Sequence, residues 1–196
     1  MLVGEYGAKL GGSVLTIPFH NFHATVRETG NIPPDLQKDA RYVETPLYFR
    51  EDGTIEKVDF NPSQIPFGYR FFLLDSGEKF DTEPLVKQFL KQMENSGFAS
   101  SIRNEYLPLN QKLIESLLGH READPAMLVR VISDFQFTHF RKMIPDNMID
   151  AWIEGQISNE YYLKLHGSGG GFILGITHHT SMENLTERWK KDLIWV

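Results

Sequence analysis

The segment from Tyr161 to Thr180 constrains the fold more than any other part of the chain. Two β-like runs, ISNEYYLKL (157–165) and GFILGITH (171–178), lie on either side of a link that is rich in glycine. Glycine adopts the backbone angles of tight turns at little cost. The segment therefore predicts a β-hairpin with a glycine-rich tip, formed late in the chain.

The order of the remaining elements indicates the fold class. The first part reads mainly as strands, at 13–19, 41–50, 54–60 and 69–75, and Asp52-Gly53 is a typical hairpin turn between two of them. Helical patterns follow, then the hairpin, then a last helix. This segregation predicts an α+β fold with a largely antiparallel sheet and a cluster of four to five helices.

A chain of 196 residues suits one domain, or one domain with a small appendage. The change from strand-like to helix-like sequence near Phe80 predicts two parts. Residues 1–80 form a β-rich N-terminal part, a possible subdomain. Residues 81–196 form a helical part with the C-terminal hairpin and helix. We expect the two parts to pack as one compact unit.

Capping residues predict where the helices begin and end. The predicted boundaries are Thr82 to Gly97, about Asn110 to Leu118 before Gly119, Asp124-Pro125 to a point before Pro145, Asp146 to Glu154 before Gly155, and a last helix opened by a capping box of Thr180 and Glu183. The polar stretch DSGEKFD (75–81) reads as a turn between the strand at 69–75 and the first of these helices.

The glycine-rich link is also a candidate for binding phosphate, because backbone N–H groups in such a segment can surround an anion. The chain has no G-x-x-x-x-G-K-[ST] motif, and Phe172 stands where the third glycine of G-x-G-x-x-G belongs. A plain hairpin tip is therefore favoured. The alternative keeps a ligand site whose candidate residues are His166, Ser168, Gly169, Gly170 and His178.

No catalytic residue, metal site or cofactor is predicted. Cysteine is absent, which excludes thiolate catalysis and cysteine-ligated zinc, and no G-x-S-x-G motif occurs. His178 and His179 should point to opposite faces of a strand, and His20 and His23 lack a third ligand. Whether the chain is an enzyme stays open at this point.

The composition bears on partners and on location. The formal net charge is −6 and the basic residues are scattered, which disfavours a nucleic-acid partner on electrostatic grounds. The N-terminus does not resemble a signal peptide, and no apolar run reaches the roughly 20 residues that span a bilayer. We expect a soluble protein without a membrane partner, either cytoplasmic or virion-associated.

Apolar residues near both ends of the chain favour an interaction role. Free termini are usually polar, yet this chain begins MLVG and ends DLIWV. Leu2, Trp195, Phe137 and Phe140 are the candidate interface residues. The leading interpretation is a non-enzymatic subunit or adaptor of a larger assembly, such as a virion or a multi-subunit complex, that associates with other subunits or with itself. The alternative is a small hydrolase or phosphate-ligand binder that uses His166, Gly167–Gly171 and His178.

Overall fold

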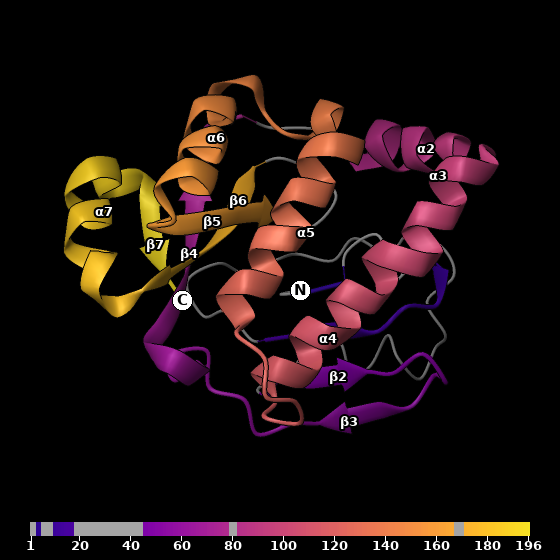
Figure 1. Ribbon diagram of the computed structural model, residues 1–196, viewed down its shortest axis with the longest axis horizontal. Helices are drawn as coiled ribbons and strands as arrows, with labels where there is room; N and C mark the ends of the chain where they lie inside the picture. Colours follow the sequence, from indigo (N-terminus) through magenta and orange to yellow (C-terminus); the bar gives the residue numbers. More distant parts are fainter. Residues whose placement is uncertain (1–2, 5–9, 18–44, 79–81, 167–170) are drawn as a thin grey trace.

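The computed structural model describes residues 3–4, 10–17, 45–78, 82–166 and 171–196. In this part of the chain the strands form two antiparallel sheets (Figure 1). The first sheet has the order β1-β2-β3 and consists of β1 (Val14–Thr16), β2 (Leu47–Phe49) and β3 (Ile55–Lys57). The second has the order β5-β6-β4-β7 and consists of β4 (Tyr69–Asp75), β5 (Tyr161–Leu165), β6 (Phe172–His178) and β7 (Leu193–Trp195).

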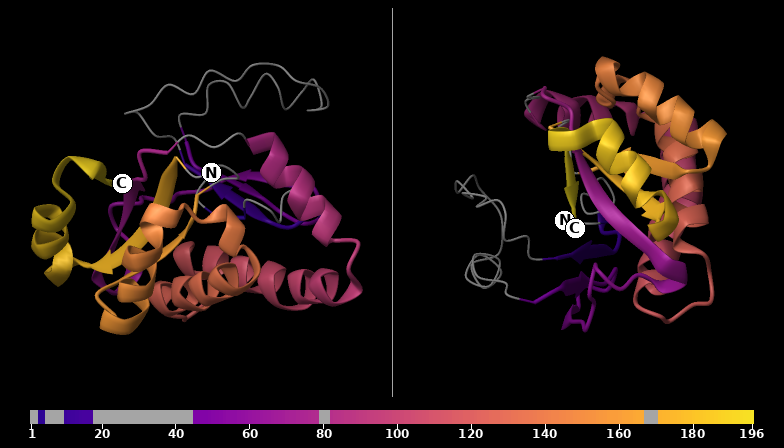
Figure 2. Two further views of the ribbon diagram at one scale, coloured as in Figure 1. Left: turned by 90° about the horizontal axis from the view of Figure 1, so that it is seen from above. Right: turned by 90° about the vertical axis from the view of Figure 1, so that its left-hand side faces the viewer.

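The helices cover these sheets and confirm the predicted α+β class. They are α2 (Thr82–Gln92), α3 (Ser96–Ser101), α4 (Leu107–Leu117), α5 (Pro125–His139), α6 (Ile149–Ser158) and α7 (Met182–Trp189). A π-helical turn, Ile102–Tyr106, joins α3 to α4. Helices α5 and α6 pack on β5, whereas α4 packs on α5 and β1. Figure 2 shows α4, α5 and α6 as one layer beside the strands.

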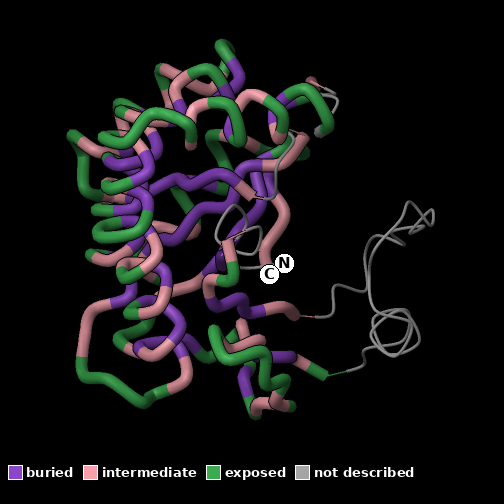
Figure 3. The backbone as a smooth tube through the Cα atoms, turned by 90° about the vertical axis from the view of Figure 1, so that its right-hand side faces the viewer, coloured by how far each residue is buried: buried purple, intermediate pink, exposed green. Residues whose placement is uncertain are grey.

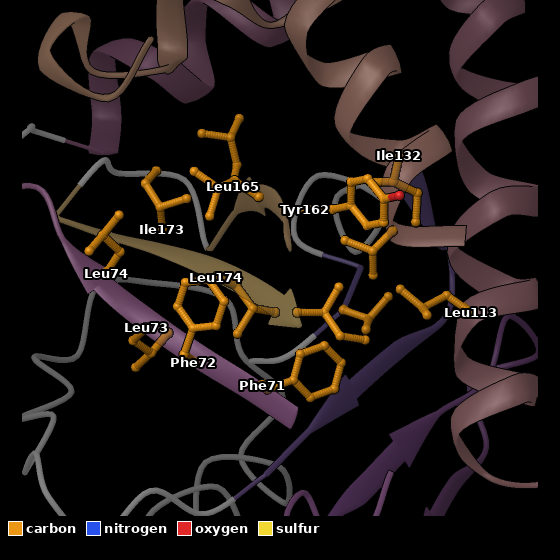
Figure 4. Close-up of a cluster of buried hydrophobic side chains, with 14 of the residues drawn as sticks. Phe71, Phe72, Leu73, Leu74, Leu113, Ile132, Tyr162, Leu165, Ile173 and Leu174 are labelled. Atoms are coloured by element: carbon orange, nitrogen blue, oxygen red, sulfur yellow. The ribbon is translucent and has the colours of Figure 1, made fainter. Parts of the chain in front are cut away.

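Strand β4 lies at the centre of the core. Phe71, Phe72, Leu73 and Leu74 are all buried, and successive strand residues point to opposite faces, so both faces of β4 are covered. Figure 3 shows how buried residues follow the strands and the inner sides of the helices. Figure 4 shows the side chains of β4 and β6 meeting Leu113 of α4 and Ile132 of α5.

Some helix boundaries follow the predicted caps. Helix α5 begins at Pro125, and the Asp124 side chain accepts hydrogen bonds from the backbone N–H groups of Ala126 (2.8 Å) and Met127 (3.3 Å). Gly119 follows the end of α4 with a positive φ of 73°. Both are confirmed because capping depends only on residues that are near in sequence.

Three other predicted boundaries are wrong. Helix α2 ends at Gln92, and Gly97 lies inside α3, whose N-terminus is capped by Asn95. Helix α6 continues through Gly155 to Ser158. The capping box is absent, because a 3₁₀ turn occupies His179–Ser181 and α7 begins at Met182 without a side-chain cap.

The apolar C-terminus pairs with the chain's own sheet. Strand β7 pairs with β4, and Val196 donates its N–H to the Phe71 carbonyl at 3.0 Å. The ring of Trp195 lies 5.7 Å from that of Phe72, and its Nε1 donates to Thr186 Oγ1 at 3.3 Å. Packing within the chain therefore accounts for the apolar C-terminus, which the sequence analysis assigned to an interface with a partner.

The other candidate interface residues differ in exposure. Phe140 is 1% exposed and packs among the rings of Phe89, Phe98, Tyr106 and Phe135, so it is not available to a partner. Phe137 is half-buried under the Arg141 guanidinium group. Leu2 lies outside the described residues.

The division near residue 80 stays a prediction. Strand β4 precedes this division, whereas β6 and β7, the strands that pair with β4, follow the division. Within the described ranges, none of the helices is long and apolar enough to cross a membrane.

Candidate functional site

The predicted hairpin is present in the second sheet. Strands β5 and β6 are antiparallel, with a register that runs from Tyr161↔Thr177 to Leu165↔Ile173. His166 follows β5 and Gly171 precedes β6, so these two residues mark the ends of the link between the strands. Gly167, Ser168, Gly169 and Gly170 lie outside the described residues. The described part of the candidate site therefore consists of its two flanks, the residues next to the link at the end of β5 and at the start of β6.

His178 lies at the other end of the strand pair. It is opposite Tyr69, the first residue of β4, whereas Ile173 is opposite Leu165 next to the link. His178 is five positions further along β6 than Ile173, which corresponds to about 16 Å. The His178 Nδ1 lies 2.8 Å from Thr180 Oγ1. The structure does not bring His178 to the glycine-rich link.

The histidine pair at that far end does not form a metal site. The rings of His178 and His179 lie 4.1 Å apart, and His179 Nδ1 is 3.2 Å from the Gly68 carbonyl oxygen. Across the described residues, no group of three or more His, Cys, Asp or Glu side chains could hold a metal ion. His20 and His23 lie outside that part of the chain.

On the β6 side of the link, Gly171 is held by the turn that follows β4. The Ser76 N–H and the Ser76 hydroxyl both donate to the Gly171 carbonyl, at 3.0 Å and 3.1 Å. Asn147, in the 3₁₀ turn Asp146–Met148 before α6, donates its side-chain amide to the Ser76 carbonyl at 2.7 Å. Ser76 is 4% exposed, so these bonds lie in a dry environment where polar groups need partners.

On the β5 side, Leu165 is held by two buried side chains. Its N–H donates to Gln136 Oε1 of α5 at 2.8 Å, and its carbonyl accepts from Lys164 Nζ at 2.8 Å. Gln136 Nε2 in turn donates to the Tyr106 hydroxyl at 2.9 Å. Lys164, Gln136 and Tyr106 are all 0% exposed.

Sequence reasoning missed both flanking networks. In the described part of the predicted turn DSGEKFD, Asp75 Oδ1 accepts the Gly77 N–H at 2.9 Å, whereas residues 79–81 lie outside the described residues. Nothing in this segment of the sequence indicates contact with Gly171. Gln136 lies in the aromatic run FQFTHF, where only the apolar residues were considered. The one signal in the sequence for these contacts was the presence of the polar residues Gln136 and Lys164 within otherwise apolar patterns.

His166 sits between Leu165 and the link as a neutral imidazole. Burial lowers its pKa from 6.5 to about 3, and the neighbouring Lys164 cation adds to this effect. Its Nδ1 is buried and has no hydrogen-bond partner among the described residues. A neutral imidazole nitrogen can donate or accept one hydrogen bond, depending on its tautomer. His166 is therefore suited to binding a ligand without contributing charge at neutral pH.

Comparison with known proteins gives a likeness of fold. No protein-family model matches the sequence, and no curated protein matches it significantly. Phosphomevalonate kinase from Streptococcus pneumoniae, solved with phosphomevalonate and AMPPNP, matches with a TM-score of 0.54 and 17% identity over 73% of this chain and 43% of that one. Mevalonate kinase from L. major, solved with R-mevalonate, matches with a TM-score of 0.59 and 12% identity over 85% of this chain and 52% of that one.

The chain shares the fold of these small-molecule kinases. It spans about half the length of the two kinases that it matches. The interpretation as a non-enzymatic subunit or adaptor of an assembly is overturned by this likeness, because the shared fold is that of two enzymes. The terminal tryptophan that favoured that interpretation packs within the second sheet.

Proposed function

We propose that this chain binds a phosphorylated small molecule, such as a nucleotide, at the link between β5 and β6. The likeness of fold to two small-molecule kinases carries the proposal, and the glycine-rich link between β5 and β6 is the segment whose composition suits a phosphate. The proposed ligand-binding residues are His166 and the segment 167–171. His178 is not among them, because it lies at the opposite end of the strands.

The chemistry of the segment supports this choice. Glycine leaves backbone N–H groups accessible, and several such groups in succession can hold phosphate oxygens. No lysine stands in a G-K-[ST] pattern, so these N–H groups would supply most of the binding. The two flanks, Leu165 and Gly171, are held by hydrogen bonds to Gln136 and Ser76, so both ends of the link are fixed before a ligand binds.

The proposal is tested by NMR on the full ¹⁵N-labelled chain. AMPPNP with Mg²⁺ should shift the amide signals of residues 166–171, because glycine amides respond strongly to a nearby phosphate. Adenosine, which has the same base and sugar without phosphate, is the matched control and should leave these signals in place. Equal shifts with adenosine, or no shift with millimolar AMPPNP, would show that the link does not bind phosphate.

A small-molecule kinase must also transfer the phosphoryl group. If the chain has this activity, it should release ADP from ATP when a suitable acceptor alcohol or phosphate is present, and the amide shifts should occur at similar nucleotide concentrations. Release of ADP without any response from residues 166–171 would assign the activity to another site.

A further inference from the structure

We infer that a pocket between α2 and the end of α5 binds a small organic oxyanion, a carboxylate or a phosphate carried on a short apolar stem. The inference goes beyond the proposed function and does not depend on it. The pocket has a volume of about 180 Å³, below the roughly 300–1,000 Å³ of sites for drug-sized ligands. The described residues that line it are Gln88, Gln92, Thr138, His139, Phe140, Arg141, Lys142 and Met143.

The pocket lies where the C-terminal parts of two helices meet. The ring of Phe89 in α2 is 5.9 Å from the ring of Phe140, the residue that follows α5, and Figure 1 shows α2 beside this end of α5. A 3₁₀ turn, Arg141–Met143, comes next, and the Met143 N–H donates to the Phe140 carbonyl at 2.7 Å. Phe140 and Met143 are both buried, so they form the inner, apolar side of the pocket.

The charge of the described lining residues favours an anion. Lys142 is exposed and has no ion-pair partner among the described residues, and none of those that line the pocket is acidic. Arg141 pairs with Asp146 at 3.5 Å, but the Asp146 side chain is 95% exposed, so solvent weakens this attraction. In a chain with a formal net charge of −6, a pocket of positive sign attracts small anions locally.

Two glutamines from α2 supply hydrogen-bonding groups. Gln88 and Gln92 are one helical turn apart, so their side chains lie on the same face of α2, and both are partly buried. Gln92 Oε1 is buried and has no hydrogen-bond partner among the described residues. A buried carbonyl oxygen without a partner is destabilising. The Gln92 amide therefore gains by turning toward a ligand, to which its NH₂ group can donate.

Basic residues after a helix also have a structural use, because they offset the partial negative charge of the helix C-terminus. That use accounts for His139, whose ring packs on Phe135 at 4.3 Å, and for Arg141, which lies over the Phe137 ring at 5.7 Å. It does not account for a pocket wall of two amides, one of them with an unpartnered oxygen. The combination of free charge and unused amide groups is what favours a ligand.

The inference is tested by NMR on the full ¹⁵N-labelled chain at constant ionic strength. The probes are isobutyrate and methyl phosphate, each with one anionic group on a short apolar stem. At millimolar concentration either probe should shift the backbone amides of residues 138–143 and the side-chain amides of Gln88 and Gln92. Isobutyramide has the shape of isobutyrate without its charge, and it is the matched control that should leave these signals in place.

Lys142→Met removes the charge and keeps the length of the side chain. Because Lys142 is exposed, the variant should fold like the wild type, and its Kd for the better-binding probe should rise about tenfold. Lys112→Met makes the same charge change at an exposed lysine of α4 that does not line the pocket. It should change the Kd by no more than about twofold, since solvent and salt screen a distant surface charge.

Gln92→Leu separates binding from stability. Leucine lacks the unpartnered oxygen, so the free energy of unfolding should stay the same or rise, whereas the Kd should rise about threefold. A purely structural Gln92 would leave the Kd unchanged.

The remaining outcomes decide between the two proposals. No shift at residues 138–143 with either probe, equal shifts with isobutyramide, or equal effects of Lys142→Met and Lys112→Met would overturn the inference. Tighter binding of one probe supports it and identifies the anionic group as carboxylate or phosphate. If AMPPNP shifts residues 138–143 and not 166–171, the proposed function at the link fails while the anion site remains. A failure of AMPPNP to bind anywhere leaves the result with the two small probes unaffected.

Discussion

Two glycines in the second half of the chain make room for aromatic rings. A Cβ added to Gly155 of α6 would lie 2.6 Å from Tyr161 Cε2 and 2.8 Å from the Tyr161 carbonyl oxygen. A Cβ at Gly175 of β6 would collide with the ring of Phe72. Sequence reasoning placed a helix end at Gly155. The prediction was wrong because glycine serves both for chain reversal and for close approach, and only the structure tells which.

Gly155→Ala should lower the free energy of unfolding by about 1–3 kcal/mol, since α6 must move away from β5 to admit the methyl group. Urea unfolding followed by circular dichroism measures the change. Gly171→Ala is the matched control, because the nearest atom of the described residues to its added Cβ, the Glu78 carbonyl oxygen, is 3.8 Å away. That control should stay within about 0.5 kcal/mol of the wild type. Equal effects at both positions would contradict the close approach of α6 to Tyr161.

His166 should make stability depend on pH. Its pKa is near 6.5 when unfolded and about 3 when folded, chiefly because of burial. Above pH 6.5 both states are neutral and stability is complete. As the pH falls from 6.5 toward 3, only the unfolded state takes up the proton, so stability is lost by at most about 1.4 kcal/mol per pH unit.

The wild type should therefore lose about 1–2 kcal/mol more than His166→Gln between pH 6.5 and pH 5. Urea titrations of the two proteins at several pH values test this difference. Glutamine is a suitable replacement because it is polar and does not titrate. Parallel pH profiles for the two proteins would mean that His166 is not buried as a neutral group.

At the scale of single elements, β7 shows how an apolar chain end can be used internally. It has three residues, Leu193–Trp195, and it completes one side of β4. Phe72 of β4 touches Trp195 and Trp189, so the last strand and α7 both pack against the same ring. An apolar terminus can be buried by its own sheet or by a partner, and composition does not distinguish these two possibilities.

Trp195→Ala should consequently lower the free energy of unfolding by about 2–4 kcal/mol, through loss of the Phe72 contact and of the bond to Thr186. Thermal unfolding monitored by circular dichroism checks the size of the effect. Ile157→Ala, at a side chain on α6 that is 76% exposed, provides a control and should be close to neutral. A wild-type stability for Trp195→Ala would show that β7 does not hold the sheet.

At the scale of the whole molecule, the sequence predicted the parts better than their arrangement. Strand β4 was predicted at 69–75 and is present there, and the start of α5 at Asp124-Pro125 was correct. Such features follow from periodicity and capping, which involve neighbouring residues. The sheet order β5-β6-β4-β7 involves pairs far apart in sequence, and no pattern in one sequence specifies them.

The candidate site was predictable to a similar extent. The glycine-rich link and His166 stand out in the sequence. The residues that hold the two ends of the link do not stand out in the sequence. Ser76 is 95 residues from Gly171, and Gln136 is 29 residues from Leu165. His178 was grouped with the link because it is near in sequence, yet an antiparallel strand carries it to the opposite end. Proximity along the chain was the misleading signal.

The central place of β4 also has a consequence during synthesis. Its apolar residues leave the ribosome well before β6, which pairs with it from Tyr69↔His178 to Asp75↔Phe172. At ordinary elongation rates, the roughly hundred residues between them take about 5–20 s to make. Throughout that interval, neither β6 nor β7, the strands that pair with β4 in the described structure, is complete. The nascent chain therefore presents an aggregation-prone segment, of the kind that chaperones bind, until the hairpin emerges.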